Sequence, residues 1–228
     1  SPTGPWTHKG HIMDHTPRNR GNHPGIADFK GKTYIFGQNY DLKNIDIQRH
    51  YERRSVTFTE MKYAADGTIP ELDYWLDQNP AEQLHTFNPY RRVEAETSNW
   101  AYGMKSAKVG FDNTGIVEKM PFSEGKRNMY IYNVDKDEYI RLRGVDFGEG
   151  AKRFNISTAG TGTATLTVRL DSYNGPVVGT VTIKSTGKVE KYRTFNTKIN
   201  GAKGVHDLYL CFDEAEGDIR LDWWEFKK

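Results

Sequence analysis

Three carboxylates in two short segments are the residues of this sequence with the clearest capacity for chemistry. Glu94 and Glu96 are two positions apart in Val93-Glu-Ala-Glu96, so a strand there would place both side chains on one face. Asp222 stands in the aromatic segment Arg220-Leu-Asp-Trp-Trp-Glu-Phe226. If the first and last strands of a sandwich pair, the three carboxylates converge, and a hard, oxygen-seeking Ca²⁺ would relieve their repulsion. Solvated carboxylates at a strand edge are the alternative interpretation.

Other reactive residue types are isolated along the chain. Cys211, the one cysteine, excludes an internal disulfide and cysteine-ligated zinc, and its segment Leu208-Tyr-Leu-Cys-Phe212 predicts a packed strand residue. His206 beside Asp207 is predicted to be a strand-end residue rather than a catalytic base. The acidic turn Asp135-Lys-Asp-Glu138 lacks the glycine and the ligand spacing of an EF-hand loop.

The composition is typical of a globular, β-rich chain. The 228 residues are 27% charged and 36% hydrophobic, and the net charge of +2 comes from 32 basic and 30 acidic residues. This balance argues against a nucleic-acid or membrane-surface partner, which would need a concentrated basic patch. The aromatic content of 13% and the 22 glycines favour strands and tight turns. They also suit sugar binding, in which pyranose faces stack on aromatic rings.

Strands must position these residues, and the strand pattern changes near residue 90. From 92–97 to 218–226, short candidate strands alternate with glycine-containing turns, which predicts a β-sandwich. Before this region, Gly31–Phe36 and Arg53–Thr59 are the clearest strands, and so few strands cannot bury a core alone. Residues 1–72 are therefore expected to be part of a domain. The segment 73–91 has two Asn-Pro steps and no alternation, which predicts a linker.

An ordered set of short motifs in the second region resembles family 6 carbohydrate-binding modules. The motifs are Glu94-Ala-Glu96, Gly144-Val-Asp-Phe-Gly148, Arg169-Leu-Asp171, Gly179-Thr-Val181, Gly204-Val-His-Asp-Leu-Tyr209 and Leu221-Asp-Trp223. The resemblance covers about residues 92–228. It implies a β-sandwich jelly roll with a structural calcium ion, whose carboxylate ligands would be Glu94, Glu96 and Asp222.

The resemblance also implies a sugar cleft in the loops at one end of the sandwich. The family places two aromatic rings, a Glu and an Asn there, but the matching positions carry Ala107, Asn133, Val189 and Arg220. Without the rings little stacking is left, and each lost polar contact costs about 1 kcal/mol. We therefore expect this cleft to be weak or inactive. The family has a second site on a concave sheet face, where exposed Tyr and Trp residues could bind a chain.

The first 72 residues resemble the last part of a glycoside hydrolase family 43 domain, which is a five-bladed β-propeller. The resemblance rests on Ser1-Pro-Thr-Gly-Pro-Trp-Thr-His-Lys-Gly10, Gly21-Asn-His-Pro-Gly25, Phe29-Lys-Gly-Lys32, Glu52-Arg-Arg-Ser-Val56 and Tyr63-Ala-Ala-Asp-Gly-Thr-Ile69. The three catalytic carboxylates of that family lie on earlier blades, so no catalytic residue is expected here. His23 and either Arg53 or Arg54 match residues near the substrate pocket, and a surface histidine and strand-edge arginines are the alternative interpretation.

These resemblances predict the C-terminal portion of an extracellular or periplasmic enzyme that degrades arabinoxylan, xylan or arabinan. Its partners would be hemicellulose and the missing catalytic blades of the same enzyme, and this portion alone should be inactive. Two alternatives stay open. The chain could be a stand-alone carbohydrate-binding protein, or a structural module that braces a catalytic domain without binding sugar.

Overall fold

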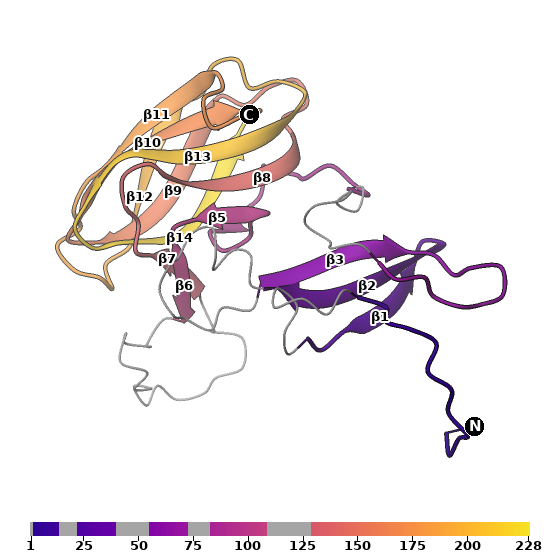
Figure 1. Cartoon of the computed structure of the whole chain (residues 1–228). Helices are drawn as coiled ribbons and strands as arrows, with labels where there is room; N and C mark the ends of the chain where they lie inside the picture. The colour runs from indigo at the N-terminus through magenta and orange to yellow at the C-terminus, as the bar shows by residue number, and fades with distance from the viewer. Residues whose placement is uncertain (1, 14–21, 40–54, 73–82, 109–128) are drawn as a thin grey trace. The chain divides into compact units, whose positions relative to one another are not determined.

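The computed structural model describes residues 2–13, 22–39, 55–72, 83–108 and 129–228 (Figure 1). These residues form β-strands and loops, which confirms the predicted all-β class. No helix long and apolar enough to cross a membrane occurs in the described ranges. The chain divides into two compact units, Ser1–Gln83 and Leu84–Lys228.

The strands of the first unit are β1 (Gly25–Phe29), β2 (Lys32–Asn39) and β3 (Ser55–Met61). The strands of the second unit are β4 (Val93–Glu94), β5 (Trp100–Tyr102), β6 (Lys105–Lys108), β7 (Met129–Tyr132), β8 (Glu138–Asp146), β9 (Arg153–Gly160), β10 (Thr163–Leu170), β11 (Val177–Ile183), β12 (Arg193–Lys198), β13 (Val205–Glu216) and β14 (Ile219–Lys227).

The first unit is a three-stranded antiparallel sheet in the order β1-β2-β3. Alternation along the strands gives it two different faces. Ile35 and Met61 are buried on one face, where they pack against side chains from the segments that precede and follow the sheet in the sequence. Phe36 and Phe58 are opposite each other on the other face, stacked with their ring centroids 5.5 Å apart, and both stay exposed.

The second unit is a β-sandwich, as the strand pattern predicted. One sheet has five strands in the order β11-β10-β13-β8-β5, and the other has the order β12-β9-β14-β7-β6 with β4 paired to β14. The core between the sheets is rich in fully buried aromatic side chains, namely Phe147, Phe154, Phe212, Trp224 and Phe226. Such a dry, interlocking core makes the sandwich a rigid support for residues on its outer faces.

The second unit begins earlier than the sequence suggested. Phe87 donates its amide to the Gly144 carbonyl (2.8 Å) and accepts the Asp146 amide (2.9 Å), and the Tyr90 hydroxyl donates to the Phe147 carbonyl (2.6 Å). Residues 84–91, expected to be the end of a linker, are therefore bonded into the sandwich. The segment lacks the alternation that marks a strand, yet its backbone groups pair with strand β8. Residues 73–82 lie outside the described residues.

Candidate functional site

Four tyrosines meet on the outer face of the five-stranded sheet, and we call Tyr102, Tyr139, Tyr173 and Tyr209 the tyrosine cluster. Tyr139 is the central ring. Its centroid lies 5.4 Å from that of Tyr102, in a parallel stack with an interplanar angle of 6°. It also lies 5.3 Å from the Tyr173 ring and 5.7 Å from the Tyr209 ring, both tilted. Rings packed in this way form an apolar surface that exists before any ligand binds.

Strand register explains why these residues meet. Tyr102 of β5 is paired with Tyr139 of β8, and Tyr209 of β13 is paired with Arg141, two residues further along β8. Ile140, between the two β8 positions, is fully buried, so Tyr139 and Arg141 face outward. Tyr173 comes from the turn after β10. The Tyr102 side chain is 37% exposed, which leaves part of the cluster open to a ligand.

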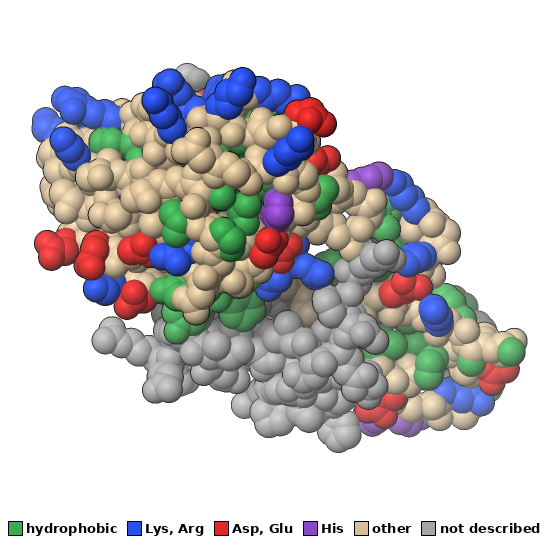
Figure 2. Space-filling view, turned by 90° about the horizontal axis from the view of Figure 1, so that it is seen from above, with side chains coloured by type: hydrophobic (Ala, Val, Ile, Leu, Met, Phe, Trp, Pro, Cys, Tyr) green, Lys and Arg blue, Asp and Glu red, His purple; other side chains and the backbone are tan. Residues whose placement is uncertain are grey.

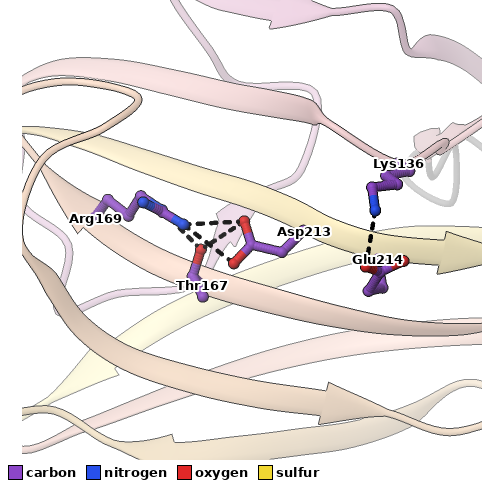
Figure 3. Close-up of polar contacts among 5 residues, drawn as sticks. All are labelled: Lys136, Thr167, Arg169, Asp213 and Glu214. Atoms are coloured by element: carbon purple, nitrogen blue, oxygen red, sulfur yellow. Dashed lines mark hydrogen bonds and ion pairs between the residues drawn. The ribbon is translucent and has the colours of Figure 1, made fainter.

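Charged groups on β10 and β13 border the tyrosine cluster, because Arg169 of β10 is paired with Tyr209 of β13. Figure 3 shows the contacts that join Thr167, Arg169 and Asp213. Arg169 Nη2 donates to both carboxylate oxygens of Asp213, at 3.2 and 3.1 Å, and Arg169 Nε donates to Thr167 Oγ1 at 3.0 Å. The Thr167 hydroxyl in turn donates to Asp213 Oδ1 at 3.2 Å. This network fixes donors and acceptors beside the rings, which is the combination that orients a polyhydroxylated ligand.

Cys211 lies beneath the tyrosine cluster. It is paired with Tyr139 on one side and Thr167 on the other, and it is almost completely buried. Burial raises the pKa of its thiol to about 12. Cys211 is therefore a packed residue that stays protonated at neutral pH, and the cluster offers no thiolate chemistry.

The positions matched to the family's loop cleft lie along the six-stranded sheet. The guanidinium of Arg220 on β14 is 4.9 Å from the centroid of the Tyr130 ring, and Tyr130 is 3% exposed. The backbone of Ala107 pairs with Tyr130, while its side chain lies outside the described part. Arg220 thus covers an aromatic ring that would otherwise face outward.

Two further cleft positions offer little to a sugar. Asn133 is exposed directly after β7, with a positive φ of 57°, and Val189 is half-buried. The nearby Tyr192 is half-buried, and burial raises the pKa of its hydroxyl to about 12. No side chain at these positions presents a ring to solvent.

The three predicted metal-ligating carboxylates come together where the first and last strands of the sandwich pair. Trp223 of β14 is paired with Glu94 of β4, and the Ala95 amide donates to the Asp222 carbonyl at 2.9 Å. Burial raises the pKa of Glu96, and the negative charges of Glu94 and Asp222 raise it further. Glu96 Oε2 is buried without a hydrogen-bond partner.

Arg92 contacts two of these carboxylates. Its Nε donates to Glu94 Oε1 at 2.9 Å, and its Nη2 donates to Asp222 Oδ1 at 3.2 Å. Among the described residues, no three His, Cys, Asp or Glu side chains are closed around a common point in the manner of a metal centre. The chemistry of these groups suits a cation, because Arg92 bonds two of the three carboxylates and leaves Glu96 Oε2 unsatisfied.

Of the three residues predicted near a substrate pocket, one lies in the described part of the chain. His23 is exposed before β1, and Arg53 and Arg54 lie outside the described residues.

Comparison with known proteins decides the family. Residues 94–228 match the model of the carbohydrate binding module family 6. The chain belongs to this family. A family 6 module from Clostridium cellulolyticum, solved in complex with xylose, is 26% identical, with a TM-score of 0.52, and the match covers 62% of this chain and 100% of that one.

Two longer proteins are similar to nearly the whole chain. An arabinoxylan arabinofuranohydrolase of Paenibacillus polymyxa is 31% identical over 233 residues, which are 99% of this chain and 35% of that protein. A glycoside hydrolase family 43 arabinoxylan arabinofuranohydrolase of Bacillus subtilis, solved with cellotetraose, matches with a TM-score of 0.76 and 28% identity, over 100% of this chain and 46% of that one. The chain therefore spans less than half the length of each.

The sequence did not assign the tyrosine cluster. Tyr139 and Tyr209 occur in candidate strands with alternating patterns, which is the signal that could have indicated an outward aromatic face. The contribution of Tyr173 comes from a turn, and no pattern in the sequence predicts its ring contact with Tyr139.

Proposed function

We propose that this chain is the C-terminal part of a secreted arabinoxylan-degrading glycoside hydrolase, and that its family 6 module binds hemicellulose through the tyrosine cluster. The observation that carries the proposal is the partly exposed Tyr102–Tyr139 stack, bordered by the Arg169–Asp213 network. Aromatic platforms with fixed polar neighbours suit sugar rings, which have apolar faces and polar edges. The names of the two longer relatives, both arabinoxylan arabinofuranohydrolases, support arabinoxylan as the polymer.

The loop cleft would contribute little to this binding. Arg220 covers Tyr130, and neither Asn133 nor Val189 supplies an exposed ring. A sugar entering here would have to displace a cation–π contact worth about 0.5–1 kcal/mol without gaining a new stacking partner.

Affinity electrophoresis tests the proposed binding. The chain is run through native gels that contain arabinoxylan, xylan, arabinan or a mixed-linkage β-glucan. We expect retardation by arabinoxylan and xylan, and we expect Asn133→Ala to be retarded as strongly as the wild type. No retardation by any of the four would contradict sugar binding and would favour a module that braces a catalytic domain.

The first unit would be the closing blade of the catalytic propeller in the longer enzyme. Its outer face exposes the stacked pair Phe36 and Phe58, and Val56 beside them is 83% exposed. Exposed aromatic side chains in contact are typical of a face that packs against another part of a protein. The missing blades are the proposed partner, and the catalytic carboxylates would belong to them. Phe58→Asp should then impair assembly of the full-length enzyme while leaving the sandwich folded, which gel filtration and thermal unfolding would show.

We also propose that Ca²⁺ binds beside Glu94, Glu96 and Asp222. The unpartnered Glu96 Oε2 and the mutual repulsion of the three carboxylates support a bound cation, and carboxylate oxygens are the ligands that Ca²⁺ prefers. The ion would stabilise the junction of β4 and β14 and would take no part in sugar binding. Thermal unfolding with Ca²⁺ and with EDTA is the test: Ca²⁺ should raise the Tm of the wild type and should have little effect on Glu96→Gln. Equal Tm values for the wild type in both conditions would refute it.

A further inference from the structure

Three cations lie side by side at one end of the six-stranded sheet. The strand register pairs Lys198 of β12 with Arg153 of β9, and Arg153 with Lys227 of β14. Neighbouring strands are about 4.8 Å apart, so the three residues cross the sheet in a single row. Phe154, next to Arg153, is fully buried, and therefore the row occupies the outer face. We call Lys198, Arg153 and Lys227 the cationic row.

The row is poorly compensated. Lys227 Nζ is 2.7 Å from Glu225 Oε2, whereas Arg153 and Lys198 form no ion pair with any described residue. Both of these side chains are exposed. Like charges directly opposite each other on adjacent strands destabilise a sheet. A row that is unfavourable for folding needs another explanation, and an anionic ligand supplies one.

One further cation is next to the row in the chain, because Lys152 directly precedes Arg153 and is exposed. The basic residues of 184–193 belong to the other end of β12, where Arg193 is paired with Thr158. The backbone of Lys152 joins the two ends of the row, because its amide donates to the Lys227 carbonyl (2.8 Å) and its carbonyl accepts the Ile199 amide (2.9 Å). Figure 2 shows Lys and Arg side chains gathered along one side of the sandwich unit.

A second row beside the cations carries two asparagine amides and one carboxylate. Asn196 is paired with Asn155, and Asn155 is paired with Glu225. Asn155 Nδ2 donates to Glu225 Oε1 at 3.0 Å. Although burial raises the pKa of Glu225, hydrogen bonds from Lys227 and Asn155 lower it below its usual value, so this carboxylate stays ionised and holds both neighbours in place. The amides at this position can hydrogen-bond to hydroxyl groups of a bound ligand, while the adjacent cations can pair with its carboxylates.

We propose that the cationic row binds the carboxylate groups of an acidic plant polysaccharide, in which uronic acid units carry the charge. An arginine guanidinium is planar and matches a carboxylate through two parallel hydrogen bonds, and the flanking lysines extend the attraction along the polymer. The combination of cations with a neighbouring asparagine row favours a charged sugar polymer over a ligand that offers charge alone. This surface lies on the opposite sheet from the tyrosine cluster and does not depend on neutral-sugar binding there.

The test uses the full chain in native gels that contain polygalacturonate, a polymer of uronic acid units. We compare the wild type with Arg153→Gln/Lys198→Gln, which removes two exposed charges from the row. The matched control, Lys9→Gln/Lys62→Gln, removes two exposed positive charges of the first unit that form no ion pair with a described residue. At low salt we expect the row variant to bind polygalacturonate roughly tenfold more weakly than the wild type, because each exposed ion pair contributes modestly. The control should bind as the wild type does.

Raising the salt concentration should weaken wild-type binding, since exposed charges are screened within about 10 Å at 0.1 M ionic strength. Three results would overturn the proposal: no retardation of the wild type by polygalacturonate, an equal loss in the row variant and the control, or equal retardation by duplex DNA with the same loss in the row variant. Parallel gels with neutral arabinoxylan keep the two binding proposals separate, because the row variant should be retarded there like the wild type.

Discussion

Replacing Tyr102 by alanine is the sharpest test of sugar binding at the tyrosine cluster. Tyr102 is 37% exposed, and its ring stacks on that of Tyr139, with the two centroids 5.4 Å apart. Losing one ring pair costs about 0.5–1.5 kcal/mol of stability, which leaves the sandwich core intact. Tyr139→Ala would remove the ring contacts with Tyr102, Tyr173 and Tyr209 and cost about 1.5–4.5 kcal/mol, so a loss of binding there could reflect unfolding.

For the ligand, Tyr102 is the most open ring of the platform. Truncating an aromatic contact residue typically costs about 1–2 kcal/mol of binding free energy, which weakens Kd roughly five- to thirtyfold. Isothermal titration calorimetry with xylohexaose and with soluble arabinoxylan measures this change. Thermal unfolding of the same samples establishes that the variant is folded at the temperature of the titration.

The chain offers a matched control for this substitution. Tyr132 of β7 belongs to the six-stranded sheet, and its ring lies 5.8 Å from that of Tyr130 in a tilted pair. Tyr132→Ala removes the same atoms and a similar ring contact, but on the opposite sheet from the cluster, and it should leave Kd unchanged. An unchanged Kd in Tyr102→Ala, or equal losses in both variants, would refute the reasoning.

Three further predictions concern individual side chains. Because its pKa is raised from 9.0 to about 12, Cys211 should carry about a thousandfold less thiolate than an exposed cysteine at pH 8. A thiol reagent should therefore label it only after unfolding, and rapid labelling of the native chain would contradict its burial. The folded pKa of Glu96 lies above its ordinary 4.5, so without Ca²⁺ its contribution to the free energy of unfolding is full below pH 4.5 and falls as the pH rises through the folded pKa. Glu96→Gln should remove this pH dependence, measured by urea unfolding between pH 4 and 7. An identical pH dependence in the variant would count against the prediction. Arg220→Ala should lower stability by about 0.5–1 kcal/mol through loss of its contact with Tyr130, and an unchanged Tm would show that this contact is not stabilising.

The fold class and the carboxylate junction could be predicted because local patterns carry them. Alternation marks each strand, and the Glu-x-Glu spacing of Glu94 and Glu96 fixes a shared face before any partner is known. Their meeting with Asp222 required one further assumption, namely that the first and last strands pair. The start of the sandwich could not be predicted, because the Phe87 backbone pairs with a strand more than fifty residues later, and no local pattern signals such pairing.

The cationic row and the tyrosine cluster could not be predicted from the sequence for a related reason. The net charge of +2 is nearly neutral and argues against a basic patch, yet the register aligns Arg153, Lys198 and Lys227 from three separate strands. The tyrosine cluster likewise needs the register of β5, β8 and β13. Because a shift of one residue moves every side chain to the opposite face, sequence patterns alone cannot determine which outward residues become neighbours.

Chemical-shift mapping by NMR tests most directly whether this module binds hemicellulose through its tyrosine cluster. Isotope-labelled chain is titrated with xylohexaose, and the amide resonances are followed to saturation. The account predicts shifts concentrated in β5, β8 and β13, around Tyr102, Tyr139 and Tyr209. Shifts concentrated around Asn133, Val189 and Arg220, or no shifts at millimolar sugar, would contradict it.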